Sequence, residues 1–222
     1  MKKLLLISFM LLALSSALFA QRFKGAIMGG MNISQVDGDE VVGYNRVGGH
    51  LGVAAILPLN NWDITLETVF NQKGAWEKQQ YRDTINDYVY TGQYDLRLNY
   101  VEVPLMAHYT DRGWITAGAG VSWGRLVSFN ETEHGGSVPP YSDTVSFNKN
   151  DFDILVDLQF RIYQRLKFNI RYAYSLAPIR EREYKEFYTG DEWSRRQYNN
   201  LFTFRLVYIF NEALPPKRTR GE

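Results

Sequence analysis

The segment that decides the fold is residues 151–175, which read DFDILVDLQFRIYQRLKFNIRYAYS. Apolar and polar side chains alternate on both sides of the dipeptide Gln164-Arg165. In the first half, one face carries Phe152, Ile154, Val156, Leu158, Phe160 and Ile162, and the other carries Asp153, Asp157, Gln159 and Arg161. Successive side chains of a β-strand point to opposite faces, so this alternation is typical of strands. We therefore predict antiparallel strands at residues 151–163 and 166–177, joined by a tight turn.

The same alternation recurs along most of the chain after residue 21. It predicts six further strands, at residues 25–34, 46–57, 62–73, 94–109, 114–128 and 200–210. The connections alternate between long polar segments (35–45, 75–93, 130–150 and 178–199) and short turns (58–61, 110–113 and 164–165). An up-and-down antiparallel barrel has this rhythm when one rim is elaborated and the other is tight. The sequence therefore predicts an all-β fold, an eight-stranded antiparallel up-and-down β-barrel.

Composition agrees with this fold class and excludes several functions. The chain has 222 residues, of which 45% are hydrophobic and 15% aromatic; this length suits one domain, and the aromatic share favours strands. It contains no cysteine, which excludes disulfides, thiolate nucleophiles and cysteine-based metal sites. The formal net charge is +1, so the chain lacks the overall basic charge of a nucleic-acid-binding protein.

The first twenty residues have the layout of a cleavable signal peptide. Lys2 and Lys3 precede an apolar run at residues 4–14, and small residues follow at 15–17. We predict cleavage after Ala17 or Ala20, with residues 1–20 as the signal peptide, 21–211 as the barrel domain and 212–222 as a flexible basic periplasmic tail. A retained membrane helix is the alternative, although the run is short for a span of about 20 residues.

The orientation of the two faces decides between a membrane barrel and a soluble one. At residues 116–124 the polar face carries the small residues Thr116, Gly118, Gly120, Ser122 and Gly124, which suit the narrow lumen of an eight-stranded barrel. Large aromatic residues gather near the predicted strand ends, as in the girdles of outer-membrane barrels. We assign to these girdles Trp62, Trp114, Tyr163, Tyr208 and Phe210 on the tight-turn side, and Tyr94, Trp123, Tyr174 and Phe202 on the long-loop side. We therefore predict a transmembrane β-barrel in the outer membrane of a Gram-negative cell; a soluble periplasmic lipocalin-like ligand binder is the alternative.

The polar face, once turned inward, brings acids and bases together. We predict that Glu67, Glu102, Asp153 and Asp157 meet Arg161, Lys167, Arg171 and Arg205 along the barrel axis. Opposite charges in a narrow lumen should pair, because an isolated buried charge costs several kcal/mol. Eight strands leave no aqueous channel of useful width, so we predict a salt-bridged plug rather than a pore.

The spacing of chemically active residues predicts no cofactor, no metal site and no enzymatic activity. His50, His108 and His134 lack any metal-ligand spacing. The alternative is an outer-membrane enzyme that modifies lipids. Such an enzyme would need a serine–histidine–acid contact of about 3 Å, and Ser122 with His50 is the candidate pair.

Residues 94–109 change the phase of the alternation. Leu96, Leu98 and Tyr100 are apolar at even positions, whereas Val101 and Val103 are apolar at odd positions. One extra residue near Tyr100 and Val101, a β-bulge, would keep all of them on a single outward face.

The last long loop carries five basic and five acidic residues between Arg180 and Arg196. We expect a solvated, self-neutralised loop. The alternative is a loop that grips a partner or the phosphates of lipopolysaccharide.

Four landmarks together resemble the PorT-like outer-membrane β-barrel family of Bacteroidetes-type bacteria. The first predicted strand is glycine-rich with an asparagine (residues 25–34), the third ends on Gln72-Lys73-Gly74, the fourth holds Tyr100-Val101-Glu102-Val103-Pro104, and the fifth holds Gly118-Ala119-Gly120. The likeness runs from about residue 22 to residue 210. It implies an eight-stranded barrel in the outer membrane.

The resemblance implies little about activity, although the family's namesake is tied to a protein-secretion system. We expect a structural or adaptor component of the cell envelope or of a secretion system. Outer-membrane lipid, lipopolysaccharide and envelope or secretion proteins are the expected partners, and nucleic acid is not.

Overall fold

A computed structural model describes residues 23–39, 41–78, 80–84, 87–91, 93–111, 113–133, 136–137, 147–185 and 192–212. The predicted signal peptide, His134 and residues 213–222 lie outside these ranges.

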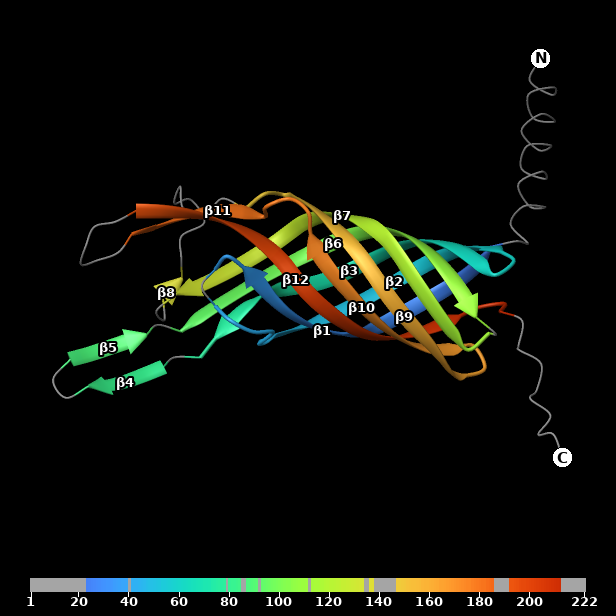
Figure 1. Cartoon of the computed structure of the whole chain (residues 1–222), viewed down its shortest axis with the longest axis horizontal. Coiled ribbons are helices and arrows are strands. Elements are labelled where there is room, and N and C mark those ends of the chain that lie inside the picture. Colours follow the sequence, from blue (N-terminus) through green and yellow to red (C-terminus); the bar gives the residue numbers. More distant parts are fainter. Residues whose placement is uncertain are drawn as a thin grey trace, which may run out of the picture.

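Eight antiparallel strands close into a ring, which confirms the predicted fold (Figure 1). They are β1 (Lys24–Asp37), β2 (Arg46–Leu59), β3 (Trp62–Glu77), β6 (Tyr94–Asp111), β7 (Ile115–Glu133), β9 (Asn150–Tyr163), β10 (Leu166–Ser175) and β12 (Glu192–Ile209). Each pairs with the next in this order, and β12 pairs with β1 to close the barrel. In the described part of the chain, the structure contains no helix with the length and apolar character needed to cross a membrane.

The two ends of the barrel differ. The tight turns after β2, β6 and β9 lie at the same end as the start of β1 and the end of β12, and we call this the turn end (Figure 1). Asn60 in the first of these turns has a φ of 58°, a left-handed conformation that asparagine tolerates better than most residues.

The opposite end, which we call the loop end, carries additional strands. These are the hairpin of β4 (Gln80–Thr84) and β5 (Asp87–Thr91), the short β8 (Gly136–Ser137) against β7, and β11 (Arg180–Lys185) against the first part of β12 (Figure 1). Three of the four predicted long loops therefore contain strands that extend the sheet or form a hairpin beyond it.

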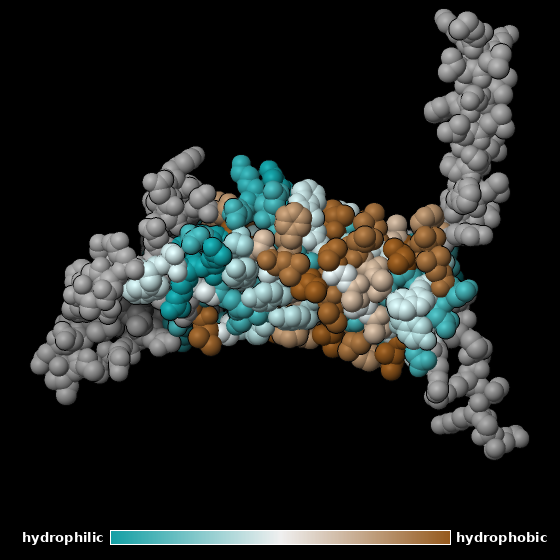
Figure 2. All heavy atoms as spheres, turned by 45° about the horizontal axis from the view of Figure 1, so that its top comes forward, coloured by the Kyte–Doolittle hydropathy of each residue, from teal (hydrophilic) through white to brown (hydrophobic). Residues whose placement is uncertain are grey.

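The apolar face of the barrel points outward and the charged face points inward. Along β9, the side chain of Ile154 is 46% exposed whereas that of Asp153 is 1% exposed. Exposed apolar residues form a band over the part of the barrel nearer the turn end, and hydrophilic residues gather toward the loop end (Figure 2). This arrangement is the reverse of a soluble protein, in which large contiguous apolar patches are rarely exposed.

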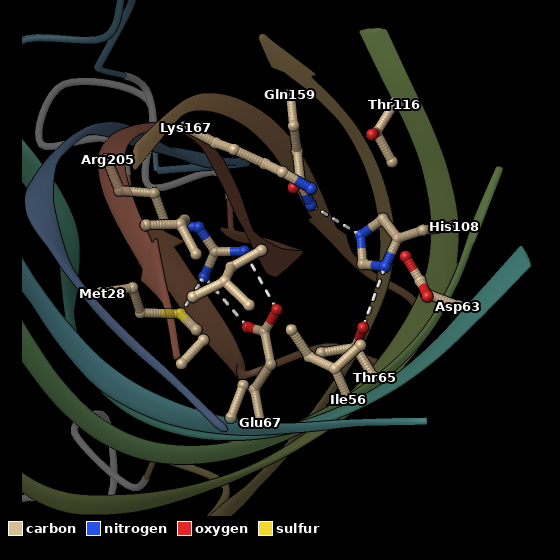
Figure 3. A pocket seen from close by; sticks show the side chains of 14 residues that line it. Met28, Ile56, Asp63, Thr65, Glu67, His108, Thr116, Gln159, Lys167 and Arg205 are labelled. Atoms are coloured by element: carbon tan, nitrogen blue, oxygen red, sulfur yellow. Dashed lines mark hydrogen bonds and ion pairs between the residues drawn. The ribbon is translucent and has the colours of Figure 1, made fainter. Parts of the chain in front are cut away.

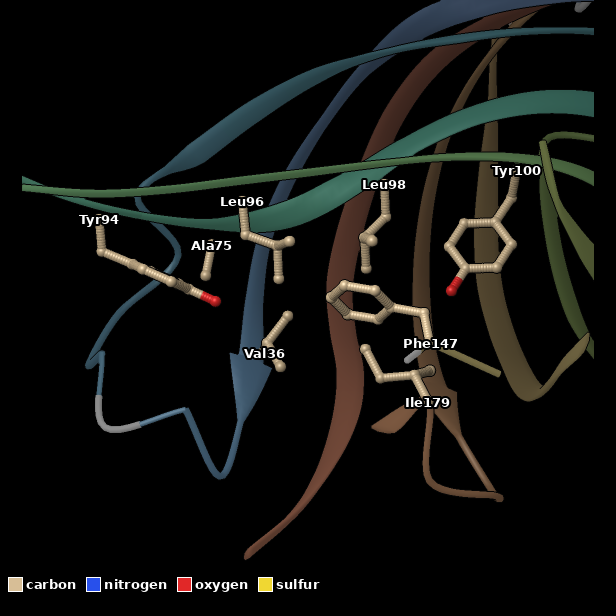
Figure 4. Close-up of a cluster of buried hydrophobic side chains, with 8 residues drawn as sticks. All are labelled: Val36, Ala75, Tyr94, Leu96, Leu98, Tyr100, Phe147 and Ile179. Atoms are coloured by element: carbon tan, nitrogen blue, oxygen red, sulfur yellow. The ribbon is translucent and has the colours of Figure 1, made fainter. Parts of the chain in front are cut away.

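The loop end is closed by an apolar cluster inside the barrel (Figure 4). It consists of Val36, Ala75, Tyr94, Leu96, Leu98, Tyr100, Phe147 and Ile179. Phe147 and Ile179 come from the connections before β9 and after β10, and they point into the mouth of the barrel (Figure 4). The mouth is therefore filled by side chains from both strands and connections.

The predicted bulge in β6 is wrong. Leu96, Leu98 and Tyr100 are fully buried and point inward, in unbroken alternation with the exposed Arg97 and Val101. The irregularity lies on β7 instead. Asn99 pairs with Ser128 and Tyr100 pairs with Leu126, so one residue of β7, Val127, is left between the two pairs as a bulge.

One member of the predicted aromatic girdle is also wrong. Tyr94 is 6% exposed and packs inside the apolar cluster, because it shares the inward face of β6 with Leu96 and Leu98. The other predicted girdle residues point outward: Trp62, Trp114, Tyr163, Tyr208, Phe210 and Trp123 are exposed, and Tyr174 and Phe202 are half-buried. Ring contacts join neighbours in this set, such as Tyr208 and Phe210 with centroids 5.2 Å apart.

Candidate functional site

The centre of the lumen holds two acids and two arginines, which we call the central layer: Glu67, Asp157, Arg171 and Arg205. The guanidinium of Arg171 donates to both carboxylate oxygens of Glu67 at 2.8 Å. Arg205 donates to the same oxygens at 2.9 and 3.0 Å (Figure 3). Asp157 Oδ2 accepts from Arg171 Nη2 at 2.8 Å and lies 3.7 Å from Arg205 Nη2. All four residues are at most 3% exposed. Two charges of each sign meet, so the layer is neutral without a bound ion.

His108 extends the central layer toward the turn end, and Gly118 makes its position possible. His108 on β6 and Asp157 on β9 are both cross-strand partners of Gly118 on β7. His108 Nε2 lies 3.1 Å from Asp157 Oδ1, and His108 Nδ1 lies 3.1 Å from Thr65 Oγ1. A Cβ atom on Gly118 would lie 2.2 Å from His108 Cδ2 and 2.6 Å from Asp157 Oδ1. The two side chains therefore meet across a strand that has no side chain at that level.

We expect Gly118→Ala to lower the free energy of unfolding by about 1–3 kcal/mol, because the added methyl group forces His108 and Asp157 apart in a packed interior. Urea titration of the lipid-refolded protein measures this loss. Gly29→Ala is the matched control on β1, where a Cβ atom would meet nothing closer than 3.6 Å. Equal effects of the two substitutions would contradict the account of Gly118.

A second group of charges lies nearer the loop end, and we call it the Lys73 cluster: Lys73, Glu102, Asp151 and Asp153. Lys73 Nζ lies 2.6 Å from Asp153 Oδ2, 2.8 Å from Glu102 Oε1 and 3.1 Å from Asp151 Oδ2. These side chains come from β3, β6 and β9 and are at most 4% exposed. Asn71 and His50 together link the two groups. Asn71 Nδ2 donates to Glu102 Oε2 at 3.0 Å, and Asn71 Oδ1 lies 3.4 Å from His50 Nδ1. His50 Nε2 in turn lies 3.1 Å from Arg205 Nη1 of the central layer.

The turn end of the lumen is closed by Glu212, which follows β12. Arg161 donates from Nη1 and Nη2 to the Glu212 carboxylate at 2.9 Å each, and Lys167 Nζ lies 3.2 Å from it. The prediction that Arg161 and Lys167 meet the four lumen acids is therefore wrong. Both lie near the β9–β10 turn and pair with Glu212, which follows β12. Burial alone would raise the pKa of Glu212, but the hydrogen bonds from Arg161 and the charge of Lys167 hold that pKa below its ordinary value.

The cavity between the central layer and the turn end is small (Figure 3). Its volume is about 20 Å³, and Thr65, Glu67, His108, Gln159 and Lys167 are among the residues that line it. This volume holds about one water molecule. It offers no room for a hydrated ion to pass or for an acyl chain to bind.

A buried arginine closes the loop end above the apolar cluster. Arg180 is 1% exposed and binds both oxygens of Glu131, at 2.7 and 2.9 Å. It also donates to Gln197 Oε1 at 2.8 Å, and its guanidinium carbon lies 4.2 Å from the centre of the Phe147 ring. The expectation of a solvated loop is therefore wrong for Arg180, which belongs to the closed interior.

Asp39, in the connection after β1, gives this end a pH dependence. It is 6% exposed, and burial raises its pKa to about 7. The folded state then binds a proton more tightly than the unfolded state, so stability falls as pH rises from about 4 to about 7. We expect Asp39→Asn, which mimics the protonated form, to gain stability relative to the unsubstituted protein as pH rises through this window. Urea titrations across that range measure the difference, and a difference that does not change with pH would contradict it.

The described histidines do not assemble a serine triad. His50 lies 3.1 Å from Arg205 and 3.4 Å from Asn71, and the structure does not bring it to Ser122. His108 contacts the hydroxyl of Thr65 and the carboxylate of Asp157, but Thr65 is 4% exposed and the cavity that it lines has a volume of about 20 Å³. Among the residues that the structure describes, no three histidine or acidic side chains form a group that could hold a metal ion.

Sequence reasoning missed several residues of the lumen. Lys73, Asn71 and Asp151 share the inward faces of Glu67 and Asp153 by simple alternation, so the period-two pattern could have found them. His50 and His108 likewise alternate with exposed apolar neighbours. Glu212 carries no such signal, because it lies beyond the last strand.

Taken together, a closed antiparallel barrel with an apolar exterior and an ion-paired interior defines the class of outer-membrane β-barrel proteins. The family described as outer membrane protein beta-barrel domain matches residues 19–181, and the chain belongs to this family.

Solved structures resemble the chain at low sequence identity. Ail, the attachment invasion locus protein of Yersinia pestis, is 15% identical with a TM-score of 0.47, covering 84% of this chain and 98% of that chain. OprG from Pseudomonas aeruginosa is 9% identical with a TM-score of 0.42, covering 86% and 96%. Neisserial surface protein A is 8% identical with a TM-score of 0.42, covering 84% and 95%. No curated protein sequence matches the chain.

Proposed function

We propose that the protein is a non-enzymatic structural or adaptor component of the outer membrane, of the PorT-like type, that serves an envelope or protein-secretion complex. The observation that carries this proposal is the filled lumen. The apolar cluster, the Lys73 cluster, the central layer and the Glu212 closure follow one another from the loop end to the turn end. A barrel filled along its axis offers its two rims and its outer surface for function.

The loop-end rim supplies the surface for a protein partner. The β11–β12 hairpin extends beyond the closed barrel (Figure 1). Trp193, Arg195 and Arg196 on its β12 strand are exposed. An aromatic side chain beside arginines is typical of the residues that dominate protein interfaces.

The outer surface supplies a second contact, with lipopolysaccharide. Trp123 and Phe152 are cross-strand partners on β7 and β9 and both are exposed. Arg125 and Lys149 lie just above them toward the loop end, also exposed, and Arg125 Nη1 donates to Asn150 Oδ1 at 3.0 Å. Aromatic residues mark the membrane interface, so these cations lie at the level of lipid phosphates.

Two measurements test the proposal together. In a planar bilayer, the purified full chain should show no channel conductance under conditions in which a porin conducts. From native envelopes, the tagged protein should capture an envelope protein, and replacing residues 183–194 with a short glycine–serine turn should abolish capture while a heat-modifiable barrel still forms. Porin-like conductance, or capture that survives the replacement, would contradict it.

A further inference from the structure

The Lys73 cluster carries more negative charge than its one cation can balance. Within the described residues, Lys73 is the only cationic group within 4.0 Å of the carboxylates of Glu102, Asp151 and Asp153. Three carboxylates and one ammonium sum to 1 − 3 = −2. The central layer cannot supply the difference, because its two guanidiniums already balance Glu67 and Asp157.

The three carboxylates are also close to one another. Glu102 Oε1 and Asp153 Oδ2 both contact Lys73 Nζ, so they are at most 2.8 + 2.6 = 5.4 Å apart. Asp151 Oδ2 and Asp153 Oδ2 are at most 3.1 + 2.6 = 5.7 Å apart. Like charges within about 6 Å, and withdrawn from water, strongly disfavour the fully ionised state.

A glycine brings two of these acids together. Gly124 on β7 is the cross-strand partner of both Glu102 on β6 and Asp151 on β9. A Cβ atom on Gly124 would lie 3.2 Å from Glu102 Cγ and 3.7 Å from Asp151 Cβ. The acids therefore face each other across a bare stretch of strand, as His108 and Asp157 do across Gly118.

The other groups that face the cluster are neutral. Asn71 of β3 donates to Glu102 Oε2 at 3.0 Å, Asn199 of β12 donates to Asp151 Oδ2 at 2.7 Å, and Ser175 of β10 donates to Asp153 Oδ1 at 3.2 Å. The phenol ring of Tyr100 lies 5.0 Å from Lys73 Nζ. These groups solvate the carboxylates without cancelling their charge.

Two buried polar atoms in or beside the cluster receive no hydrogen bond from these neutral groups. In the described part of the chain, Asp151 Oδ1 and the hydroxyl of Ser122, which is the β7 partner of Asp153, have no hydrogen-bond partner. Among the described residues, no group of acidic and histidine side chains with the arrangement of a metal site is found, and the ammonium of Lys73 already lies between these three carboxylates.

We propose that the Lys73 cluster is a buried proton-binding site, which retains at least one proton on its three carboxylates at neutral pH. The proton comes from water and returns to it, so the step needs no other reactant. Uptake forms one O–H bond on a carboxylate oxygen and changes the charge of the cluster from −2 to −1. Loss of the proton restores the repulsion and weakens the plug.

Infrared spectroscopy of the lipid-refolded full chain tests this site directly, because a protonated carboxyl has a C=O stretch distinct from that of a carboxylate. The measurement uses the Asp39→Asn background, which removes the carboxyl of Asp39, whose pKa burial raises to about 7. At pH 7 we expect a protonated-carboxyl band that is lost in Asp153→Asn or Glu102→Gln and kept in Glu181→Gln, a control at an acid that is 55% exposed on the β11–β12 hairpin. The absence of a band in the background protein, or a band that survives both cluster substitutions, would overturn the proposal.

Unfolding supplies a second readout that does not depend on one variant. Each proton retained by the folded state but not by the unfolded state lowers the folded-to-unfolded ratio tenfold per unit rise in pH. We expect this slope in the Asp39→Asn background between about pH 6 and pH 8, and its loss in Asp153→Asn. If both cluster variants fail to fold, the band and slope of the background protein still decide. A stability that does not fall with rising pH would contradict the site.

Discussion

Replacing Glu67 by glutamine is expected to lower the free energy of unfolding by about 3–5 kcal/mol, because it breaks a buried ion-paired group by removing one partner. Arg171 and Arg205 each donate two hydrogen bonds to this carboxylate. Without its charge, two guanidiniums share only Asp157, and one positive charge is left without a counterion in the interior. Urea titration of the lipid-refolded protein, followed by tryptophan fluorescence, measures the loss.

The matched control is Glu181→Gln on the β11–β12 hairpin. The side chain of Glu181 is 55% exposed and lies 3.9 Å from the exposed Arg196, so its loss should cost at most about 0.5 kcal/mol. Adding Arg205→Gln to Glu67→Gln restores the balance of charge, and the pair should cost less than the sum of the two single losses. A Glu67→Gln protein as stable as the control would show that the central layer does not hold the lumen together.

Replacing Ile154 by arginine is expected to cost about 2–4 kcal/mol, the penalty for a charge at the bilayer midplane of a barrel. Ile154 is 46% exposed in the isolated chain and points away from the lumen, between Asp153 and Leu155, which point inward. In a water-soluble protein, a substitution at such an exposed position would change stability by no more than about 0.5 kcal/mol. The surrounding lipid is therefore the whole source of the expected loss.

Ser128→Arg on β7 is the control for this substitution. Ser128 is also exposed and outward, but it lies toward the loop end, where its hydroxyl accepts from Asn99 Nδ2 at 2.9 Å. Arginine near the membrane interface costs about 0–1 kcal/mol. Equal losses for Ile154→Arg and Ser128→Arg would mean that the apolar band does not lie in the bilayer.

The phase change in residues 94–109 shows how far sequence reasoning reaches. The alternation itself predicts β6, because period two survives along its whole length. The apolar face changes at Tyr100. Between Tyr100 and the turn end, Val101 and Leu105 face outward and Glu102 faces inward. Between Tyr100 and the loop end, Leu96 and Leu98 face inward and Arg97 faces outward.

This reversal has a simple physical reason. Where a strand runs beyond the bilayer, water surrounds the barrel, and apolar side chains are again stabilised inside. A polar ladder marks that level on the outer surface, where Gln72 Nε2 donates to Asn99 Oδ1 at 3.1 Å and Asn99 donates to Ser128. The change of phase thus indicates a membrane boundary rather than a bulge, and the same reason places Tyr94 inside the barrel.

The pairing of individual charges in the lumen and the position of Glu212 could not be predicted from the sequence. Alternation could place Lys73 and Asp151 on the inward face, but which acid meets which base depends on the stagger of strands far apart in the chain. Lys73 and Asp151, for example, are separated by 78 residues. The Glu212 closure depends on how the chain turns after β12, for which the sequence carries no periodic signal.

Spin-label accessibility along β9 shows directly whether the apolar face of the barrel meets lipid and the ionic face is sealed inside. The chain has no cysteine, so single cysteines at Ile154, Leu155, Val156 and Leu158 can each be labelled without background. In bilayers, we expect frequent collisions with oxygen at positions 154, 156 and 158, and few at position 155, where Leu155 is 2% exposed. Uniform accessibility, or collisions concentrated at position 155, would contradict this arrangement.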